Sequence, residues 1–264
     1  MKAQICLVDA SKCIGCRACQ AACKQWNQLP AINTEFTGTY ENPPQYSCST
    51  WTKVVFREYN ENGRVQWLMS KQGCMHCTDA ACKLACPTGA IYHTDEGTVA
   101  IDRIKCIGCN YCAAACPFQV IGFDRFTNRA EKCTFCYDRL VNGLKPACST
   151  ACPTGSLVFG EEREIISKAQ DRVEKLKKKG HQNARIYGLD EVDGTAMLYV
   201  LADKPEKYGL PADPRVPFGT RVWNAIYGPL RVLVVIAVGF GLWANLTKNK
   251  EIDKAKEEAQ KESE

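Results

Sequence analysis

The sequence predicts an α+β fold in which two cysteine-rich modules carry an inserted β-hairpin region and are followed by a single C-terminal transmembrane helix. Three observations predict it. Of the 264 residues, 18 are cysteine, and 16 of these form four groups of four with similar spacing. Short strand-like segments follow the later groups, which indicates internal duplication. A long uncharged stretch lies near the C-terminus.

The four cysteine groups are the strongest signal. They are Cys13, Cys16, Cys19 and Cys23; Cys74, Cys77, Cys82 and Cys86; Cys106, Cys109, Cys112 and Cys116; and Cys133, Cys136, Cys148 and Cys152. The first and third groups share the spacing C-x2-C-x2-C-x3-C, and a proline follows every group but the first. Three thiolates on one tight loop can hold a [4Fe–4S] cluster, whereas the fourth cysteine is expected to start a helix and bind the neighbouring cluster. The spacing therefore predicts four [4Fe–4S] clusters in two ferredoxin-like double-cluster modules.

The same rule assigns the ligands of each cluster. Because only a short stretch separates the second group from the third, these groups are expected to exchange their last cysteines. One cluster then takes Cys74, Cys77, Cys82 and Cys116, and its neighbour takes Cys106, Cys109, Cys112 and Cys86. By elimination, a third cluster takes Cys13, Cys16, Cys19 and Cys152, and the fourth takes Cys133, Cys136, Cys148 and Cys23. The remaining cysteines, Cys6 and Cys48, are interpreted as small buried apolar residues.

Other uses of the cysteines fit this spacing less well. Cysteines two residues apart in a row do not pair off with ordinary disulfide geometry. The C-x-x-C-H motif of covalently attached haem does not occur in the sequence. Structural zinc uses paired C-x2-C knuckles, which the grouping of three plus one matches poorly. A zinc-stapled membrane scaffold remains the alternative from another functional class.

The charge of the chain does not indicate a nucleic-acid partner. The formal net charge is +5 when every thiol is counted as neutral. Four clusters of roughly −2 each would bring the folded protein to about −3. The basic side chains near the cysteine loops are Lys12, Arg17, Lys24, Lys105 and Lys132, where positive charge favours a reduced cluster. His76 lies inside the second loop and is expected near the surface.

Residues 1–215 are predicted to form the cluster domain. An insert at 24–73 contains a hairpin, with strands at 52–59 and 64–69 around the turn Asn62-Gly63. Segments 90–93, 98–102, 120–123 and 156–159 are the short strands expected beside the clusters. The region 161–203 contains an amphipathic helix, Glu161–Lys179, followed by a strand that is strongest at 197–201.

The C-terminal region is predicted to span a membrane once. Residues 216–246 are assigned to an interfacial segment and the helix, and 247–264 to a charged tail. A helix of eighteen residues counted from Pro229 would rise about 27 Å, close to the hydrocarbon thickness of about 30 Å. Trp223 and Tyr227 before it and Trp243 near its far end resemble an aromatic belt. A buried core helix is the alternative, but the charged tail supplies no apolar partner for it. Lysines in the tail weakly favour a cytoplasmic C-terminus.

Several motifs resemble the iron–sulfur (β) subunits of molybdopterin oxidoreductases. They are GCMHC at 73–77, CPTGAI at 86–91, CIGCNYCAAACPF at 106–118 and KCTFCYDRLVNGLKPACSTACPTGS at 132–156. RIYGLDEVDGTAMLYVLADKPEKYGLP at 185–211, followed by one apolar helix, is similar to the β subunits of membrane-bound formate dehydrogenases. The resemblance extends from about residue 3 to residue 246.

This resemblance implies a subunit that transfers electrons and has no catalytic residues of its own. The electrons would come from a catalytic α subunit with a molybdenum or tungsten pterin that oxidises formate. They would pass to a cytochrome b-type or other quinone-reducing subunit in the membrane. The β subunits of this family are exported with the α subunit, which would put the cluster domain on the periplasmic face. The iron–sulfur subunit of a polysulfide, thiosulfate or dimethyl sulfoxide reductase is the alternative within the same class.

Overall fold

A computed structural model describes residues 4–61 and 63–261 of the chain. The chain divides into two units, Met1–Thr220 and Arg221–Glu264. The first unit holds all the cysteines, and the second is helical over its described residues. Asn62 of the predicted hairpin turn and residues 262–264 of the predicted tail lie outside the described residues.

A four-stranded sheet joins the two ends of the first unit. Its order is β8 (Leu157–Glu161), β1 (Gln4–Asp9), β10 (Met197–Leu201) and β9 (Arg185–Tyr187). β1 is antiparallel to β8 and parallel to β10, so the first strand lies between two strands from beyond the last cysteine group. The backbone N–H of Asp9 donates to Ser156 O at 2.8 Å, and Ser156 Oγ donates to Asp9 O at 2.8 Å. This link joins the start of the first cysteine group to the end of the fourth.

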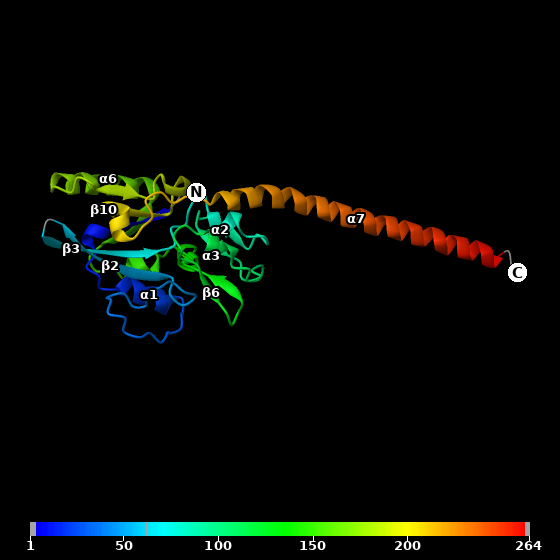
Figure 1. Cartoon of the computed structure of the whole chain (residues 1–264), viewed down its shortest axis with the longest axis horizontal. Helices are drawn as coiled ribbons and strands as arrows, with labels where there is room; N and C mark the ends of the chain where they lie inside the picture. Colours follow the sequence, from blue (N-terminus) through cyan, green and yellow to red (C-terminus); the bar gives the residue numbers. More distant parts are fainter. Residues whose placement is uncertain (1–3, 62, 262–264) are drawn as a thin grey trace. The chain divides into compact units, whose positions relative to one another are not determined.

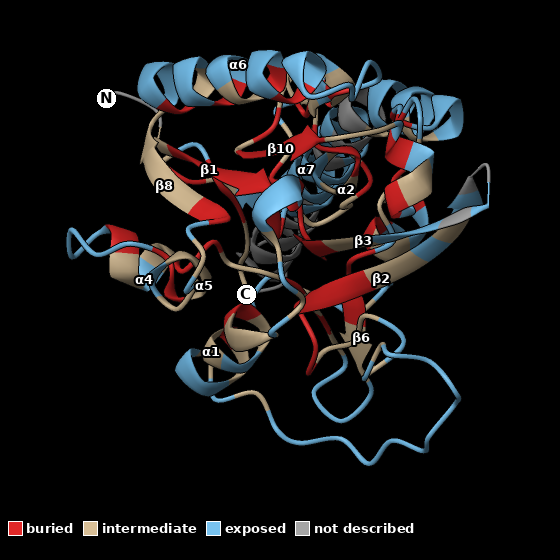
Figure 2. Ribbon diagram, turned by 90° about the vertical axis from the view of Figure 1, so that its left-hand side faces the viewer, coloured by how far each residue is buried: buried red, intermediate tan, exposed pale blue. Residues whose placement is uncertain are grey.

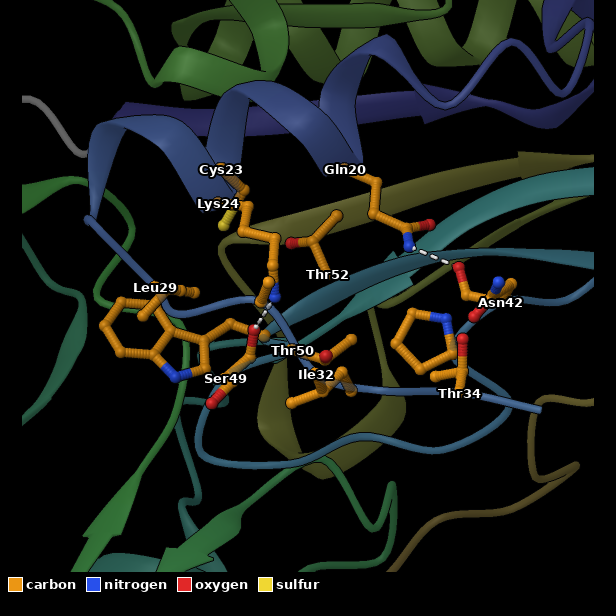
Figure 3. A pocket seen from close by; sticks show the side chains of 13 residues that line it. Gln20, Cys23, Lys24, Leu29, Ile32, Thr34, Asn42, Ser49, Thr50 and Thr52 are labelled. Carbon is orange, nitrogen blue, oxygen red and sulfur yellow. Dashed lines mark hydrogen bonds between the residues drawn. The ribbon is translucent and has the colours of Figure 1, made fainter.

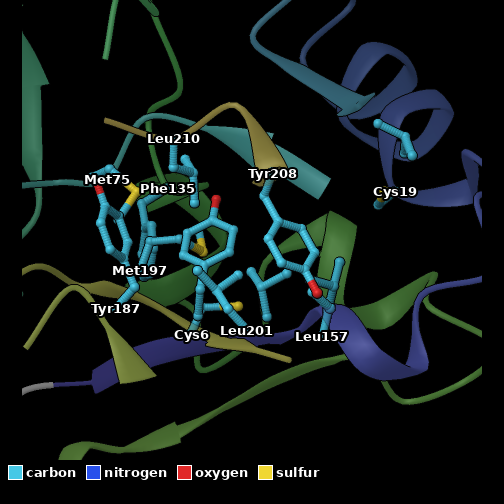
Figure 4. Packing of buried hydrophobic residues seen from close by; sticks show 14 of the residues in the cluster. Cys6, Cys19, Met75, Phe135, Leu157, Tyr187, Met197, Leu201, Tyr208 and Leu210 are labelled. Atoms are coloured by element: carbon cyan, nitrogen blue, oxygen red, sulfur yellow. The ribbon is translucent and has the colours of Figure 1, made fainter. Parts of the chain in front are cut away.

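Successive side chains along each strand point to opposite sides of the sheet, and apolar side chains lie on both sides. Helix α6 (Glu162–Lys178) covers one face, where Ile165 and Ala169 pack among Ile5 and Leu198 (Figure 1). Its other side is exposed to solvent, as its amphipathic sequence predicts (Figure 2). The opposite face of the sheet carries Cys6, Met197, Tyr199 and Leu201 into the main core, which also contains cluster-group cysteines (Figure 4).

Pairs of short helices lie beside the cysteine groups. The helices are α1 (Ala18–Trp26), α2 (Ala81–Leu84), α3 (Tyr111–Ala115), α4 (Tyr137–Leu140) and α5 (Ala147–Thr150). α1 packs against α5, and α2 packs against α3. Two hairpins follow α2 and α3 in the chain: β4 (Ile91–His93) with β5 (Val99–Ile101), and β6 (Gly122–Asp124) with β7 (Arg129–Glu131). The same arrangement of helix pairs therefore occurs twice.

The insert contains the long antiparallel strands β2 (Thr52–Glu61) and β3 (Arg64–Gly73). β2 lies close to α1, and β3 lies close to the short helix η1 (Ala10–Lys12). Two further short helices, η2 (Glu191–Asp193) and η3 (Pro205–Tyr208), flank β10 in the sequence. The hairpin thus leads directly into the second cysteine group at Cys74.

Helix α7 (Phe218–Lys261) forms the C-terminal part of the chain. It begins directly after Pro217, and the expectation that it begins at Pro229 is wrong, so Trp223 and Tyr227 lie within the helix and stack at 4.8 Å. It also extends past Leu246, because the tail is rich in alanine, lysine and glutamate, which favour helix. Its segment Phe218–Lys248 has a mean hydropathy of 1.9 in its most apolar window, none of it buried, and is long enough to cross a membrane.

Candidate iron–sulfur centres

The first and third cysteine loops share one backbone shape. Gly15 and Arg17 have φ values of 68° and 62°, and the equivalent residues Gly108 and Asn110 have 72° and 61°. Glycine enters this left-handed region without strain. Gly108 also leaves no room for a side chain, because a Cβ there would lie 2.3 Å from Asn128 O. The shared spacing of the two groups therefore corresponds to a shared local structure.

A short helix connects the third cysteine of these groups to the fourth. Cys19 and Cys23 both lie in α1, while Cys112 lies in α3 and Cys116 caps the end of that helix. The fourth cysteine thus lies at or near the helix end, and the expectation that it starts a helix is wrong. The reason is geometric, because residues four apart are separated by about one helical turn. One turn carries the chain from the ligand of one predicted cluster to the ligand of the next.

One cavity is lined by four thiols of a single predicted set, one from the first cysteine group and three from the fourth. They are Cys23, Cys133, Cys136 and Cys148, the set expected from the sequence for one cluster. All eighteen cysteines are free thiols. Within residues 4–61 and 63–261, no three Cys, His, Asp or Glu side chains converge closely enough to hold one metal ion. Thiols placed around a space fit a cube, which binds ligands at four separate corners, better than a single tetrahedral zinc ion.

The two sets predicted from the second and third groups are also brought together. Burial raises the pKa of Cys77, and the charges of Cys74, Cys82 and Cys116 raise it further. Burial raises the pKa of Cys112 to about 12, with added effects of Cys109, Cys86 and Cys106. Because charges act on a pKa mainly at short range, each thiol has the three other members of its set as near neighbours. These neighbours include Cys116 and Cys86, the last cysteines that the second and third groups are expected to exchange.

The set from the two chain ends is assembled in the same manner. Burial raises the pKa of Cys13, and the charges of Cys152 and Cys16 raise it further. Burial also raises the pKa of Cys19 to about 12, and Cys13 and Cys152 contribute to this increase. The β1–β8 link described above accounts for the approach of Cys152 to a loop more than a hundred residues earlier.

Thiols of different sets also affect one another. Burial raises the pKa values of Cys19, Cys133 and Cys82 to about 12. A thiol from the next set raises each further: Cys148 acts on Cys19, Cys74 on Cys133, and Cys112 on Cys82. These neighbours link the four sets in sequence. Because a thiol must lose its proton to bind iron, the raised pKa values mean that bound iron has to stabilise the thiolates here.

Buried polar side chains between the sets were not all evident in the sequence. Lys71, in β3, is 2% exposed, and its Nζ lies 3.8 Å from Met197 Sδ. Burial opposes its charge, but Tyr199 and the nearby thiols of Cys148 and Cys133 keep the Lys71 pKa well above its ordinary value. The signal available in the sequence was its place in a strand three residues before a cysteine group. That signal does not reveal which face of the strand is buried.

His76 is 1% exposed, so the expectation that it lies near the surface is wrong. Its Nδ1 accepts a hydrogen bond from Val99 N at 3.1 Å, and its ring packs edge-on against Phe135 at 4.8 Å. Burial, aided by Lys132 and Lys71, lowers the His76 pKa well below its usual value, so the ring is neutral. Of the two leftover cysteines, Cys6 is fully buried and is a fifth cysteine lining the cavity of the Cys133 set, and Cys48 is partly buried.

A pocket with a mixed polar and apolar lining lies against the α1 helix on the side of the insert (Figure 3). Gln20 Nε2 donates to Asn42 O at 2.9 Å, and Lys24 Nζ donates to Ser49 O at 3.0 Å. Cys23 also lines this pocket. The insert loop therefore fastens onto the helix that supplies ligands to two of the predicted clusters.

The protein-family models and the known proteins that are similar to this chain agree with one another. Two models described as 4Fe-4S dicluster domains match residues 12–90 and 65–162. The iron–sulfur subunit of the nitrate-inducible formate dehydrogenase of Escherichia coli K12 is 42% identical over 259 residues, covering 96% of this chain and 88% of the relative. A formate dehydrogenase iron–sulfur subunit of Haemophilus influenzae is 44% identical, covering 87% and 75%. The formate dehydrogenase-O iron–sulfur subunit of E. coli K12 is 43% identical, covering 89% and 78%.

Proposed function

Because this chain belongs to the family of formate dehydrogenase iron–sulfur subunits, we propose that it carries electrons through four [4Fe–4S] clusters bound by its sixteen grouped cysteines. The chain is an electron-transfer subunit, not a catalytic one. The observation that carries this proposal is the cavity lined by Cys23, Cys133, Cys136 and Cys148, because these residues are the complete ligand set expected for one cluster. Cys23 comes from the first cysteine group, more than a hundred residues before the other three.

The residues of the chain hold and insulate the clusters. Each set supplies four thiolates, so no iron is left open to substrate. A [4Fe–4S] cluster, when bound, accepts and passes on one electron at a time. The surrounding core, including Phe135, Met197 and Tyr199, excludes water from the inner sets and so contributes to their potentials.

The neighbours of the thiols support a linear order for the clusters. The set of Cys13 comes first, followed by the sets of Cys133, Cys74 and Cys106. Cys16 and Cys109, the exposed cysteines, belong to the two end sets. We assign these two sets to electron entry and exit, because transfer to another subunit needs a cluster near the surface.

The partners follow from the family and from α7. We propose that electrons come from a catalytic subunit with a molybdenum or tungsten pterin that oxidises formate, and pass to a cytochrome or other quinone-reducing subunit in the membrane. The exposed apolar surface of α7 supports its role as the membrane anchor. We place the cluster domain on the periplasmic face and the C-terminus in the cytoplasm, which alkaline phosphatase and green fluorescent protein fusions to the C-terminus can test.

Iron analysis tests the function most simply. Anaerobically purified complex should contain about sixteen iron and sixteen sulfide per copy of this subunit, in addition to those of its partners. Cys109→Ala should lose about four iron and most electron throughput, whereas Cys48→Ala, the control, should keep both. Full iron content and turnover in Cys109→Ala would refute that ligand assignment, and zinc without iron or sulfide would establish the scaffold alternative.

Formate-dependent dye reduction tests the partner. The native complex should reduce a dye with formate as the electron donor. A complex that contains this subunit and lacks formate activity, but reduces polysulfide, thiosulfate or dimethyl sulfoxide, would assign the subunit to another reductase.

A further inference from the structure

Lys71 is a buried cation that has no carboxylate partner among the described residues. Lys71 is 2% exposed. Among the described residues, its ammonium group contacts the thioether sulfur of Met197, with Nζ 3.8 Å from Sδ. Lys53, on the neighbouring strand, is the useful contrast. It is almost as buried, but its Nζ lies 2.5 Å from Glu41 Oε2. A buried ammonium without an anion is strongly unfavourable, so the site of Lys71 calls for a compensating charge.

Two of the predicted cluster sets lie close to Lys71. Met197, which its Nζ contacts, lines the cavity formed by Cys23, Cys133, Cys136 and Cys148. The backbone of Lys71 lies beside the thiol of Cys13, a member of the set at the chain ends. Lys71 therefore contacts one set through its backbone and borders the other through its side chain.

A second polar group in this region also lacks a partner. Tyr199 is fully buried on the same face of the sheet as Met197, and its hydroxyl has no hydrogen-bond partner in the described structure. Buried polar groups are nearly always satisfied, so an ammonium that contacts a thioether sulfur and a nearby hydroxyl without a partner together indicate a missing anionic group. A cluster with four thiolates carries net negative charge and would provide it.

We propose that Lys71 is the counter-charge shared by the clusters of the Cys13 and Cys133 sets, and that it raises their reduction potentials. This inference rests on the proposed function. Reduction adds a negative charge to a cluster, and a fixed positive charge in a low-dielectric surrounding stabilises that reduced state. The effect should fall with distance, so the clusters of the Cys74 and Cys106 sets should respond much less.

The test is a redox titration of the native complex, followed by electron paramagnetic resonance. In Lys71→Met, the ratio of reduced to oxidised cluster should fall at least tenfold at a fixed potential for two of the four clusters, equal to a shift of about 59 mV for a one-electron couple. The other two clusters should stay near their wild-type potentials. Lys12→Met is the matched control, because Lys12 directly precedes Cys13, a ligand of one of the same two predicted clusters, but is 45% exposed and beside Asp9. It should shift the potentials far less.

Two further variants make each outcome decisive. Lys71→Gln should reproduce the shift, and Lys71→Arg should restore potentials close to wild type. Loss of iron in both neutral variants but not in Lys71→Arg would also support a requirement for charge. Unchanged potentials in an iron-replete neutral variant would overturn the proposal, as would loss of iron in all three variants, which would assign a role to shape. Failure of the wild-type complex to contain four clusters would instead refute the proposed function.

Discussion

The two double-cluster modules use the same parts but are closed in different ways. The continuous module, residues 74–131, contains the second and third cysteine groups, the packed helices α2 and α3, and both short hairpins. The split module, residues 13–26 and 133–152, contains the first and fourth groups and the packed helices α1 and α5. Its halves meet because β1 pairs with β8 and β10. The spacing of the cysteines within a group determines the shape of its loop. Strand pairing in a sheet outside the cysteine groups determines which loops meet.

Two buried lysines near the predicted clusters also differ in what compensates their charge. Lys132, which precedes the fourth cysteine group, is 3% exposed and donates to Val99 O and to Cys133 O. Lys71, beside the split module, has no oxygen acceptor among the described residues. Backbone carbonyl oxygens thus partly compensate the charge of Lys132, whereas the proposed clusters would compensate the charge of Lys71. The following predictions test these two differences.

The largest expected effect comes from removing an exchanged cysteine in each module. Cys23→Ala should remove the cluster of the Cys133 set, and Cys86→Ala that of the Cys106 set, each with a loss of about four iron per subunit. Cys23→Ala should also weaken the fold more, because that cluster joins distant segments. Iron content and thermal unfolding measure both, with Cys48→Ala, a partly buried cysteine outside the four sets, retaining its iron as the control. Equal unfolding temperatures for the two ligand variants would contradict the proposed difference between the modules.

The closing sheet can be weakened from its far side. Ile165 in α6 is fully buried against the sheet, so Ile165→Ala should cost about 2–5 kcal/mol of unfolding free energy. On heating, iron should be lost first from the two clusters of the split module. Ile166→Ala, at the partly buried neighbouring position, should cost less. Simultaneous loss of all four resonance signals in Ile165→Ala would show that the sheet does not act on one module alone.

Lys132→Met should shift cluster potentials less than Lys71→Met, because backbone carbonyls already compensate part of the Lys132 charge. Leaving Val99 O and Cys133 O without a donor should also destabilise the fold by about 1–3 kcal/mol. Redox titration and thermal unfolding of the two variants give the comparison. A larger potential shift for Lys132→Met would reverse the proposed contrast between the lysines.

The smallest effect concerns the insert between the modules. Burial opposes the charge of Glu41, but bonds and charge interactions with Lys53, together with Phe56 N and Arg57, lower its pKa below 4.5. A folded pKa below the unfolded one stabilises the fold above about pH 4.5 and loses this effect as pH falls through the folded value. Glu41→Gln should therefore cost about 1 kcal/mol at pH 7 and much less near pH 3. Urea unfolding at both pH values measures this, and an equal cost at both would contradict the assignment.

The sequence was most informative where the structure depends on neighbouring residues. Cysteine spacing predicted a protein with 4Fe-4S dicluster domains, and the family matches at 12–90 and 65–162 confirm this. The shared spacing of the first and third groups corresponds to a shared loop shape in the structure, where Gly15 and Gly108 both have positive φ. The amphipathic stripe of α6 likewise follows from its own residues.

The sequence was less informative where distant residues decide the structure. The parallel pairing of β1 with β10 joins segments almost two hundred residues apart, and no local pattern specifies it. The burial of His76 and Lys71 depends on that packing, and polar side chains ordinarily predict exposure. Helix α7 begins at Phe218 and continues through Pro229. A proline that is typical of a helix start therefore lies inside this helix.

X-ray diffraction from crystals of the complex, recorded at the iron absorption edge, locates each cluster and the cysteines that bind it. We expect four iron clusters within this subunit, arranged in one row in the order of the Cys13, Cys133, Cys74 and Cys106 sets. We also expect Cys23, Cys86, Cys116 and Cys152 each to bind the cluster of the partner group. Fewer than four iron sites, or a last cysteine bound to the cluster of its own group, would contradict this arrangement.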